Sequence, residues 1–189
     1  MQQERAIDKY TRLVEAGAKV IHEQGFQKTL LADIAREAEI PPGSIYYYFK
    51  TKDDIAEAII NHRVKNLLEL TKKWDTYSLP KKRLNALIQV WVEDREIDSN
   101  YGCPIGSLCY ELAKNRGQLC DKSAEQLQVL IKWSELQFKE LNKSPRQASE
   151  LALHLMCALQ GVSLIANAFA DAQLISRETK HLKSWLKDL

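Results

Sequence analysis

Residues 29–52, TLLADIAREAEIPPGSIYYYFKTK, decide the fold of this chain. In their first part, residues 31–38, apolar side chains recur at i, i+3, i+4 and i+7, which is the spacing of one helix face. A second helical pattern over residues 44–49 is too short to be stable alone. The break between the two contains Pro41, Pro42 and Gly43. Two helices joined by a tight turn are typical of a helix-turn-helix, whose second helix enters the major groove of DNA.

The second of these helices carries three consecutive tyrosines, Tyr46, Tyr47 and Tyr48. Because a helix turns about 100° per residue, the three rings cannot all lie in the core. At least one phenol must face outward, where it can hydrogen-bond a phosphate or contact a thymine methyl group. Lys50 and Lys52 follow, and no acidic residue occurs between positions 43 and 53. This side of the helix is therefore predicted to be a positively charged, DNA-reading face.

The residues around this unit form one set: Gly25, Phe26, Thr29, Asp33, Ile34, Ala35, Ala38, Ile40, Gly43, Ser44, Ile45, Tyr46, Tyr48, Phe49, Lys50, Thr51 and Lys52. Together they closely resemble the signature of the tetracycline-repressor-like (TetR) family of bacterial transcription regulators, over about the first 55 residues. Three positions depart from that pattern. Leu30 stands where a second hydroxyl residue often follows, Glu39 where relatives have a glycine in the turn, and Pro41 where many have a hydroxyl residue.

The resemblance implies an all-α fold with an N-terminal three-helix helix-turn-helix domain and a C-terminal helical domain that binds a ligand and dimerises. We place the DNA-binding domain at residues 1–50 and the effector-binding and dimerisation domain at residues 51–189. Tyr47 and Ser44 are expected to read or abut bases, and Tyr46, Tyr48 and Lys52 to hold phosphates. The whole set of expected DNA contacts is Thr29, Ala32, Pro42, Gly43, Ser44, Tyr46, Tyr47, Tyr48, Lys50 and Lys52.

Composition agrees with a small regulator without demonstrating one. A chain of 189 residues fits one or two domains, and 45% hydrophobic and 28% charged residues are ordinary for a globular protein. A net charge of +2 is too small to indicate a nucleic-acid partner, so the DNA prediction depends on the local arrangement. No signal-peptide pattern is seen, and apolar stretches fall short of the ~18 residues of a membrane span. We therefore expect a cytoplasmic protein with no membrane partner.

The pattern outside the motif is helical nearly everywhere, with glycine and proline mostly at breaks. About nine helices are expected in all. Before the helix-turn-helix pair, a first helix ends at Gly25. After the pair, the fourth helix runs from a capping box at Thr51 to about Trp74, the fifth from Pro80 to about Ile97, and the sixth and seventh span residues 107–115 and 119–141. The eighth is capped by Ser144 and runs to about Ala170, and the ninth is capped by Ser176.

The eighth helix is apolar over a wide arc and carries small residues, among them Gly161, that allow close approach of another helix. It could be a fully buried core helix. The resemblance instead favours a homodimer, formed by the last two helices of each subunit. A two-fold dimer would also match a palindromic operator.

Four cysteines, at positions 103, 109, 120 and 157, have no C-x-x-C spacing and no histidine at zinc-finger spacing, so neither metal nor cofactor is expected. Cys103 lies in a Gly-Cys-x-x-Gly segment found in a subset of TetR-type regulators. It is either a thiol sensor, if its pKa is lowered, or a small buried apolar residue. Residues that could line an apolar pocket for a small-molecule effector are Trp91, Cys103, Tyr110, Trp133, Phe138 and His154.

The predicted function is a ligand-responsive regulator that binds double-stranded DNA, with repression of a palindromic operator and release by a small molecule as the leading form. A redox- or electrophile-sensing regulator that uses Cys103 is the alternative, and a helical interaction module is a third class. An enzyme is not expected, because no Ser/His/Asp set, acid pair or phosphate-binding loop has convincing spacing.

Overall fold

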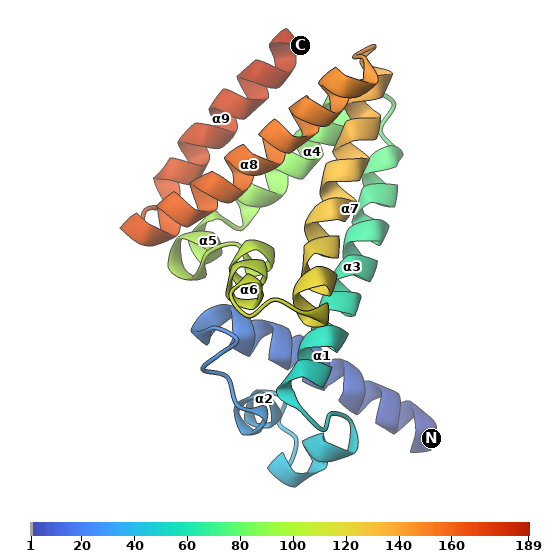
Figure 1. Cartoon of the computed structure of the whole chain (residues 1–189), viewed down its shortest axis with the longest axis vertical. Coiled ribbons are helices and arrows are strands. Elements are labelled where there is room, and N and C mark those ends of the chain that lie inside the picture. The colour runs from blue at the N-terminus through green and yellow to red at the C-terminus, as the bar shows by residue number, and fades with distance from the viewer. Residues whose placement is uncertain (1) are drawn as a thin grey trace. The chain divides into compact units, whose positions relative to one another are not determined.

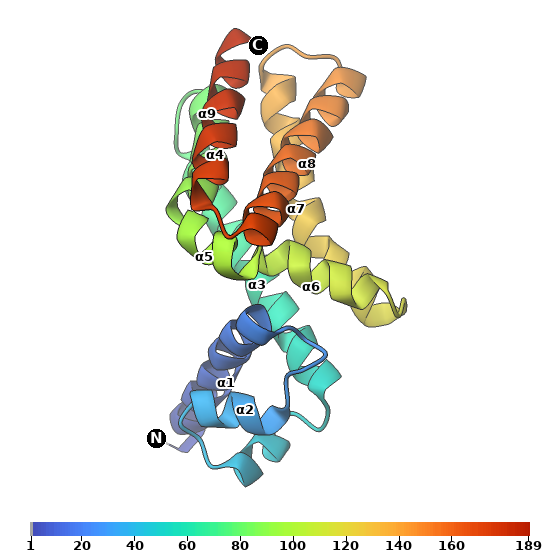
Figure 2. The same ribbon diagram turned by 90° about the vertical axis from the view of Figure 1, so that its left-hand side faces the viewer.

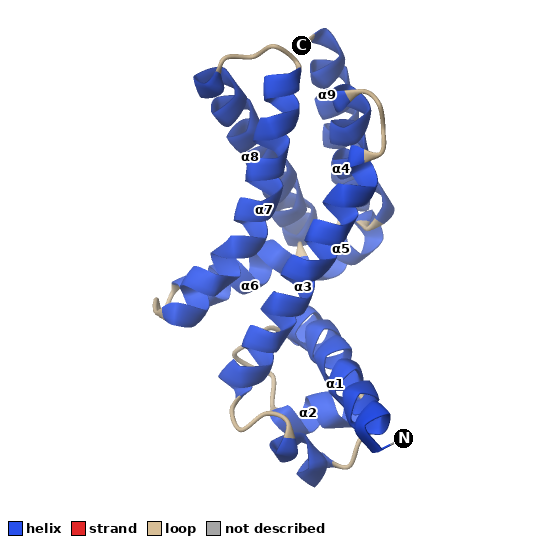
Figure 3. Cartoon of the chain, turned by 90° about the vertical axis from the view of Figure 1, so that its right-hand side faces the viewer, coloured by secondary structure: helices blue, strands red, loops and turns tan. Residues whose placement is uncertain are grey.

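The computed structural model describes residues 2–189, and over these residues it contains only helices and loops (Figures 1 and 3). There are nine α-helices and one 3-10 helix in this range, which confirms the predicted all-α fold class. The chain packs as two compact units. Unit 1 consists of the chain up to Lys65 together with Ser107–Gln126, and unit 2 of Asn66–Gly106 together with Leu127–Leu189.

Unit 1 is built from helices at the start of the chain and from one later segment, Ser107–Gln126. Its elements are α1 (Gln2–Gln24), α2 (Leu31–Glu37), the 3-10 helix η1 (Pro42–Tyr47), the first part of α3 (Lys52–Asp75), most of α6 (Pro104–Ala113) and the start of α7 (Gln118–Glu140). Leu108 and Leu112 of α6 share one apolar core with α1, α2 and α3. The packing is close: a Cβ at Gly17 of α1 would lie 2.9 Å from a methyl carbon of Ile59.

The turn between α2 and η1 keeps a left-handed backbone without a glycine. Glu39 has φ 54°, a conformation that costs an L-residue with a Cβ about 1 kcal/mol or more. The turn is held by hydrogen bonds from Glu39 N to Arg36 O at 3.0 Å and from Ile40 N to Ala35 O at 2.9 Å. Glu39 therefore adopts, at an energetic cost, a left-handed conformation that a glycine would adopt without one.

The predicted start of α3 is confirmed. Thr51 Oγ1 accepts a hydrogen bond from Asp54 N at 3.1 Å, and an Asp54 carboxylate oxygen accepts one from Thr51 N at 2.8 Å. This is a capping box. The hydrogen bond from the Thr51 amide lowers the pKa of Asp54, together with bonds from the Thr51 hydroxyl and the Lys50 amide. A lowered pKa means that the charged carboxylate, and thus the cap, is favoured at neutral pH.

Unit 2 contains the rest of α3, α6 and α7, together with α4 (Pro80–Glu93), α5 (Arg95–Tyr101), α8 (Pro145–Phe169) and α9 (Ala172–Asp188). Helix α9 packs against α4 and α8, and α5 packs against α8 and α9 (Figure 2). The largest fully buried side chains of this unit are Leu84, Leu87, Ile88, Leu130 and Phe138.

Two predicted helix boundaries in unit 2 are wrong. The fifth expected helix ends at Glu93 rather than near Ile97, because Asp94 leaves helical geometry (ψ 6°) and a new short helix, α5, begins after it. The last helix begins at Ala172, since the carboxylate of Asp171 accepts a hydrogen bond from Gln173 N at 2.8 Å. Ser176 lies inside that helix and is not its cap.

The predicted start of α8 is correct. Ser144 Oγ accepts a hydrogen bond from Gln147 N at 3.3 Å, and Gln147 Oε1 accepts one from Ser144 N at 3.1 Å. A proline follows at the first helical position, where no hydrogen-bond donor is needed.

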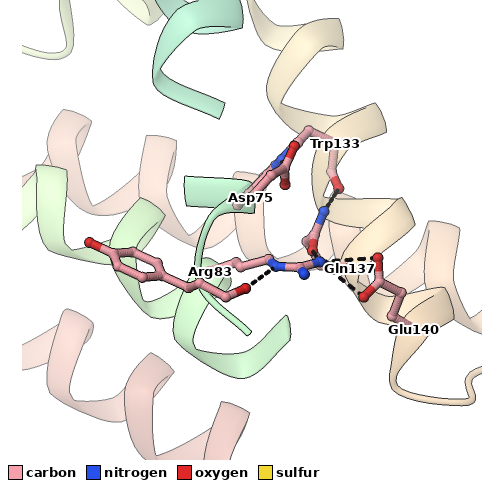
Figure 4. A network of polar contacts seen from close by, with 6 residues as sticks. Asp75, Arg83, Trp133, Gln137 and Glu140 are labelled. Atoms are coloured by element: carbon pink, nitrogen blue, oxygen red, sulfur yellow. Dashed lines mark hydrogen bonds and ion pairs between the residues drawn. The ribbon is translucent and has the colours of Figure 1, made fainter. Parts of the chain in front are cut away.

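The connection between α3 and α4 is tied to α7 by a polar network (Figure 4). Arg83 donates to both carboxylate oxygens of Glu140, at 2.9 and 3.0 Å, and to Gln137 Oε1 at 3.0 Å. Its Nε donates to the carbonyl of Tyr77 at 2.7 Å. Trp133 Nε1 donates to Asp75 at 2.9 Å. The C-terminal end of α3 is thereby fixed within unit 2.

Helix α8 exposes an apolar face. Five of its apolar side chains are exposed: Leu153, Cys157, Leu164, Ile165 and Phe169. Among the described helices it alone is long and apolar enough to cross a membrane, with a mean hydropathy of 1.5 in its most apolar window. The expectation that apolar stretches fall short of that length is thus wrong for α8. One such helix is weak evidence for a membrane protein, because core helices of soluble proteins pass the same test.

Replacing Glu39 by glycine should stabilise the protein by about 1 kcal/mol, because glycine adopts positive φ without steric cost. Thermal or urea unfolding measures the change. Glu39→Ala is the matched control, since it removes the same carboxylate and keeps a Cβ. Equal stabilities of the two variants would show that the backbone conformation carries no such cost.

Candidate nucleic-acid interface and ligand cavity

The predicted reading helix is a 3-10 helix rather than an α-helix. Ser44 N bonds to Pro41 O at 2.8 Å and Tyr48 N to Ile45 O at 2.9 Å, both with i to i+3 spacing. Pro42 occupies the first helical position and six residues leave little room for the wider α pattern. A pattern of apolar residues does not distinguish the two helix types over so short a run.

The three tyrosines of this segment differ in exposure, as helical geometry requires. Ile45 is fully buried and anchors η1 in the core. Tyr47 is 86% exposed and Tyr46 52% exposed. Tyr48 is half-buried, and its ring centroid lies 6.5 Å from that of Tyr10 in α1. Tyr46 and Tyr47 therefore present their phenols to solvent on the surface of unit 1.

The two lysines beside η1 are both engaged by backbone carbonyls. Lys50 Nζ donates to Tyr46 O at 2.6 Å. Lys52 Nζ donates to Phe26 O at 2.8 Å and Gln27 O at 2.9 Å, and it lies 4.6 Å from the centroid of the Phe26 ring. Its predicted contact with phosphate stays a prediction. In this structure Lys52 holds the segment that follows α1.

Glu111 holds the same segment from the other side. Its carboxylate accepts hydrogen bonds from Phe26 N and Gln27 N, each at 3.1 Å. Gly25 precedes them with φ 88°, and a Cβ there would lie 3.1 Å from a Glu111 carboxylate oxygen. Glu111 was not predicted. Its partners are about 85 residues away in the chain, and no local sequence pattern could have indicated the contact.

The other expected DNA-contacting residues differ in their exposure to solvent. Thr29 is fully buried, and its hydroxyl donates to Gly25 O at 2.7 Å. Pro42 and Gly43 are exposed, while Ala32 and Ser44 are half-buried. A Cβ added at Gly43 would meet no atom within 4 Å. Nothing within the chain requires a glycine there.

Unit 2 contains a small cavity of about 80 Å³. It is lined by Leu67, Leu70, Trp74, Leu87, Val90, Trp91, Asp94, Asp98, Cys103, Pro104, Ile105 and Leu130. A chain of hydrogen bonds borders it: Trp91 Nε1 donates to Ser163 Oγ at 2.9 Å, and Ser163 Oγ donates to Asp98 Oδ2 at 2.6 Å. Asp98 is only 4% exposed. The cavity is therefore apolar with carboxylates at its wall.

Comparison with known proteins assigns one segment of the chain to a family. Residues 13–59 match the family model described as "Bacterial regulatory proteins, tetR family", and these residues include most of the core of unit 1 and the helix η1. This segment is a TetR-family domain. Members are regulatory proteins and not enzymes, in agreement with the sequence-based expectation.

Two curated relatives give the extent of the similarity. The chain is 33% identical over 69 residues to the fatty acid metabolism regulator protein of Bacillus subtilis, covering 36% of this chain and 34% of that protein. It is 30% identical over 90 residues to the HTH-type transcriptional regulator BetI of Burkholderia mallei, covering 47% and 46%. The chain thus spans less than half the length of these curated relatives in the matched segments.

Solved structures share the fold over nearly the whole chain. A TetR transcriptional regulator from Chloroflexus aurantiacus superposes with a TM-score of 0.83 at 17% identity, covering 99% of this chain and 97% of that one. A second, from Legionella pneumophila, gives a TM-score of 0.81 at 16% identity, covering 92% and 94%. At these identities the likeness concerns the fold alone.

The residues expected to bind a ligand lie in several places. Trp91 and Cys103 line the cavity. Tyr110 is 68% exposed and belongs to unit 1. Trp133 packs on Trp74, with 5.1 Å between ring centroids. The remaining two aromatic candidates, Phe138 and His154, both pack against the ring of Trp185.

Sequence reasoning missed three polar or aromatic residues that line the cavity: Trp74, Asp94 and Asp98. Acidic residues in an amphipathic helix usually face solvent, so the sequence held no signal for a buried Asp98. Among the described residues, no group of three or more His, Cys, Asp or Glu side chains could hold a metal ion.

Cys103 is buried beside Asp98 and Gln160. Gln160 Nε2 donates to its sulfur at 3.4 Å, and a Cβ at Gly106 would come within 2.1 Å of Gln160 Oε1, so only glycine leaves Gln160 this position. Burial raises the pKa of the Cys103 thiol, and the negative charge of Asp98 raises it further. The protonated thiol is the unreactive form.

At pH 8 iodoacetamide should therefore modify Cys120, which is partly exposed and lies outside α8, before Cys103. Mass spectrometry of peptides from a time course measures both rates in one sample. Equal rates for the two cysteines would mean that Cys103 is more accessible or more acidic than its surroundings imply. The folded state must be kept throughout, because unfolding would expose every thiol.

Proposed function

We propose that this chain is a DNA-binding regulator that responds to a small molecule, most simply a cytoplasmic repressor released from a palindromic operator when its effector binds. The observation that carries the proposal is the surface of η1. It presents Tyr47, 86% exposed, beside Tyr46 and Lys50, and all three follow a glycine with free space around it.

The proposed DNA-reading role of η1 is supported by two of its residues, Tyr47 and Gly43, whose presence no contact among the described residues explains. The ring of Tyr47 forms no stacking pair with another ring in the described residues, and no intramolecular contact explains Gly43. A glycine and an exposed phenol on the same short helix suit a surface that another molecule approaches closely. A major groove offers hydrogen-bond acceptors and thymine methyl groups to such phenols.

The proposed homodimer is supported by the apolar face of α8. Exposed apolar residues run along it from Leu153 to Phe169, and Gly161 lies among them with no atom within 4 Å of its would-be Cβ. Contiguous exposed apolar surface is typical of protein interfaces. A second copy is the partner that suits a palindromic site, because a two-fold dimer presents two identical reading heads.

The proposed route from effector to DNA runs through helices shared by the two units. Helix α6 carries Pro104 and Ile105 at the cavity and Glu111 at the segment after α1. An effector that fits one orientation of α6 better would shift the population of reading heads between binding and non-binding positions. The two DNA-reading helices of a dimer must enter major grooves separated by one helical turn or a multiple, ~34–36 Å per turn. A small displacement of one reading helix is therefore enough to weaken binding to the operator.

Thiol sensing by Cys103 is the less favoured alternative. A reactive sensor cysteine needs a lowered pKa and exposure to solvent. The pKa of Cys103 is instead raised by burial. A noncovalent effector is therefore proposed.

Selection of bound fragments from random and genomic DNA by the purified protein tests the proposal directly. We expect a palindromic consensus. Failure to enrich any sequence at low salt, from folded protein, would contradict it.

Replacing Tyr47 by alanine should change sequence preference while leaving stability within about 0.5 kcal/mol, because the side chain is almost fully exposed. Tyr47→Phe is the informative control, since it keeps the ring and removes the hydroxyl. If the hydroxyl reads a base, both variants lose discrimination of about 1–3 kcal/mol at one position. If both variants select the parental consensus with parental affinity, the reading face lies elsewhere.

Replacing Gly161 by leucine should weaken the dimer by at least tenfold, as helices held apart lose their contact. The monomer should keep its stability, because no neighbour within 4 Å would clash with the first added carbon. Gln128→Leu, at an exposed position of α7, is the matched control for added apolar surface. Analytical ultracentrifugation over a concentration series measures both. A parental dimer in Gly161→Leu would place the interface away from this face.

A further inference from the structure

A groove on the surface of unit 2 is wider than the cavity described above. Its volume is about 610 Å³, and its lining residues come from the range Leu70–Glu93 and, in α9, from Lys183. Small-molecule sites in proteins have volumes of about 300–1,000 Å³. No residue of α8 belongs to the described lining, so the proposed dimer face contributes nothing to it. The groove is therefore large enough for a ligand of its own.

The charges of the groove are unevenly distributed. Its described lining contains three lysines, Lys73, Lys82 and Lys183, and one acidic residue, Glu93. Lys82 and Glu93 lie near opposite ends of α4, about 16 Å apart along the helix axis. Since α3 ends and α4 begins at the same short connection, Lys73 and Lys82 both lie at the end away from Glu93 (Figure 1). That end of the groove is positively charged.

The polar side chains at the Glu93 end are linked to one another. Lys183 Nζ donates to Gln89 Oε1 at 2.7 Å, and Gln89 Nε2 donates to Glu93 Oε1 at 3.4 Å. The ammonium groups of Lys73 and Lys82, by contrast, form no hydrogen bond or ion pair with any residue in the described part of the chain. Both side chains are exposed, so an incoming anion can reach them.

The position of Lys82 is unfavourable for α4 itself. The first turn of a helix carries a partial positive charge, and α4 has no acidic residue there to balance it. Lys81 and Arg83, on either side of Lys82, have partners: Lys81 Nζ donates to the carbonyl of Lys187 at 2.7 Å, and Arg83 donates to Glu140 at 2.9 Å. Lys82 has no such partner among the described residues. A bound anion would give this lysine one.

An aromatic and apolar surface adjoins the two lysines. Tyr77 is 42% exposed, and its backbone is held by the hydrogen bond from Arg83 Nε to its carbonyl at 2.7 Å. Trp74, Ala86 and Val90 belong to the same lining. Aromatic rings in contact gain stabilisation beyond the burial of their area when they meet edge to face or offset. A ligand with an anionic head and an aromatic body would contact the lysines and this surface together.

We infer that this groove binds a small organic anion, an aromatic body whose carboxylate or similar head is held by Lys73 and Lys82. Hydrogen bonds between charged partners are stronger than those of neutral groups, so an uncharged molecule of the same shape binds less well. A cation is repelled by the lysines. The inference goes beyond the proposed function and does not depend on it, because that function assigns no ligand to this groove.

Three compounds with a terminal phenyl group and the same number of carbon atoms test the charge preference: phenylpropanoate, phenylpropanol and phenylpropylammonium. Isothermal titration calorimetry of the full chain measures their binding. We expect phenylpropanoate to bind about tenfold more tightly than phenylpropanol, and more weakly as salt is added. The ammonium compound should not bind.

Equal binding of phenylpropanoate and phenylpropanol would overturn the inference, as would tighter binding of the ammonium compound. No binding of phenylpropanoate up to about 10 mM would do the same, because a ligand with a millimolar Kd would be mostly bound there. Inorganic phosphate tests the charge alone. If it bound as tightly as phenylpropanoate, the aromatic part of the inference would be wrong.

Variants at exposed positions locate the site. Lys73→Gln and Lys82→Gln should each lower the affinity for phenylpropanoate about three- to fivefold, and together they should abolish its advantage over phenylpropanol. Lys72→Gln is the matched control, since it removes the same charge from an exposed neighbour that does not line the groove. An equal loss of affinity in Lys72→Gln and Lys73→Gln would trace the effect to overall charge and overturn the site.

Lys82→Glu separates binding from folding. It places an acidic residue in the first turn of α4, so it should raise the melting temperature while it removes the preference for the anion. A lower melting temperature would give Lys82 a structural role and overturn the reason for assigning it to a ligand. Amide NMR spectra of the isotope-labelled chain with phenylpropanoate should change at Tyr77 and Asn85. Changes confined to the internal cavity, at Cys103 and Ile105, would overturn the assignment.

Discussion

One short stretch of backbone, residues 25–27, is held by two oppositely charged side chains, and the geometry of unit 1 depends on it. The carboxylate of Glu111 accepts from the amides of Phe26 and Gln27, while the ammonium of Lys52 donates to the carbonyls of the same two residues. Hydrogen bonds to charged groups contribute more than neutral ones, roughly 1.5–3 kcal/mol each before allowance for exposure to solvent. The segment connects α1 to α2, so these four bonds fix the position at which the helix-turn-helix begins. Because Glu111 comes from α6, a domain made of the first 50 residues alone would lack half of this clasp.

The four glycines without a positive φ fall into two groups according to what surrounds them. Gly17 and Gly106 have neighbours inside the chain that a side chain would strike, Ile59 and Gln160 respectively. Gly43 and Gly161 have none within 4 Å. A residue that is small without an intramolecular reason, on a surface that also exposes apolar or aromatic side chains, fits close approach by another molecule. The proposed partners are DNA at Gly43 and a second subunit at Gly161.

Local features of this chain could be predicted from sequence, and long-range ones could not. The helix-turn-helix, the capping box at Thr51 and the start of α8 at Ser144 depend on residues within four positions of one another, where pattern and physics coincide. The break at Asp94 interrupts no apolar periodicity, and the cap at Asp171 depends on the left-handed Ala170 before it. Neither leaves a distinct signal.

The candidate sites show the same division. Exposure of a tyrosine on η1 followed from the helical angle alone. To predict which residues line the cavity, one must know which faces of α3, α4, α5 and α6 meet. Selection of aromatic residues from the sequence therefore found Trp91 and missed Trp74. Glu111 and Asp98 are acidic residues in helices and look like solvated positions in the sequence. Their roles arise from partners distant in the chain, at Phe26 and Ser163.

The surroundings of Cys103 bear on the choice between two uses of this cavity. A thiol sensor reacts as the thiolate, and burial of Cys103 disfavours that charged form. The negative charge of Asp98 nearby raises the pKa of the thiol further. Neutralising Asp98 would therefore make the thiol easier to ionise but would not expose it to solvent. A buried, protonated thiol in the wall of a small apolar cavity is suited to noncovalent contact with a ligand rather than to covalent capture of an oxidant.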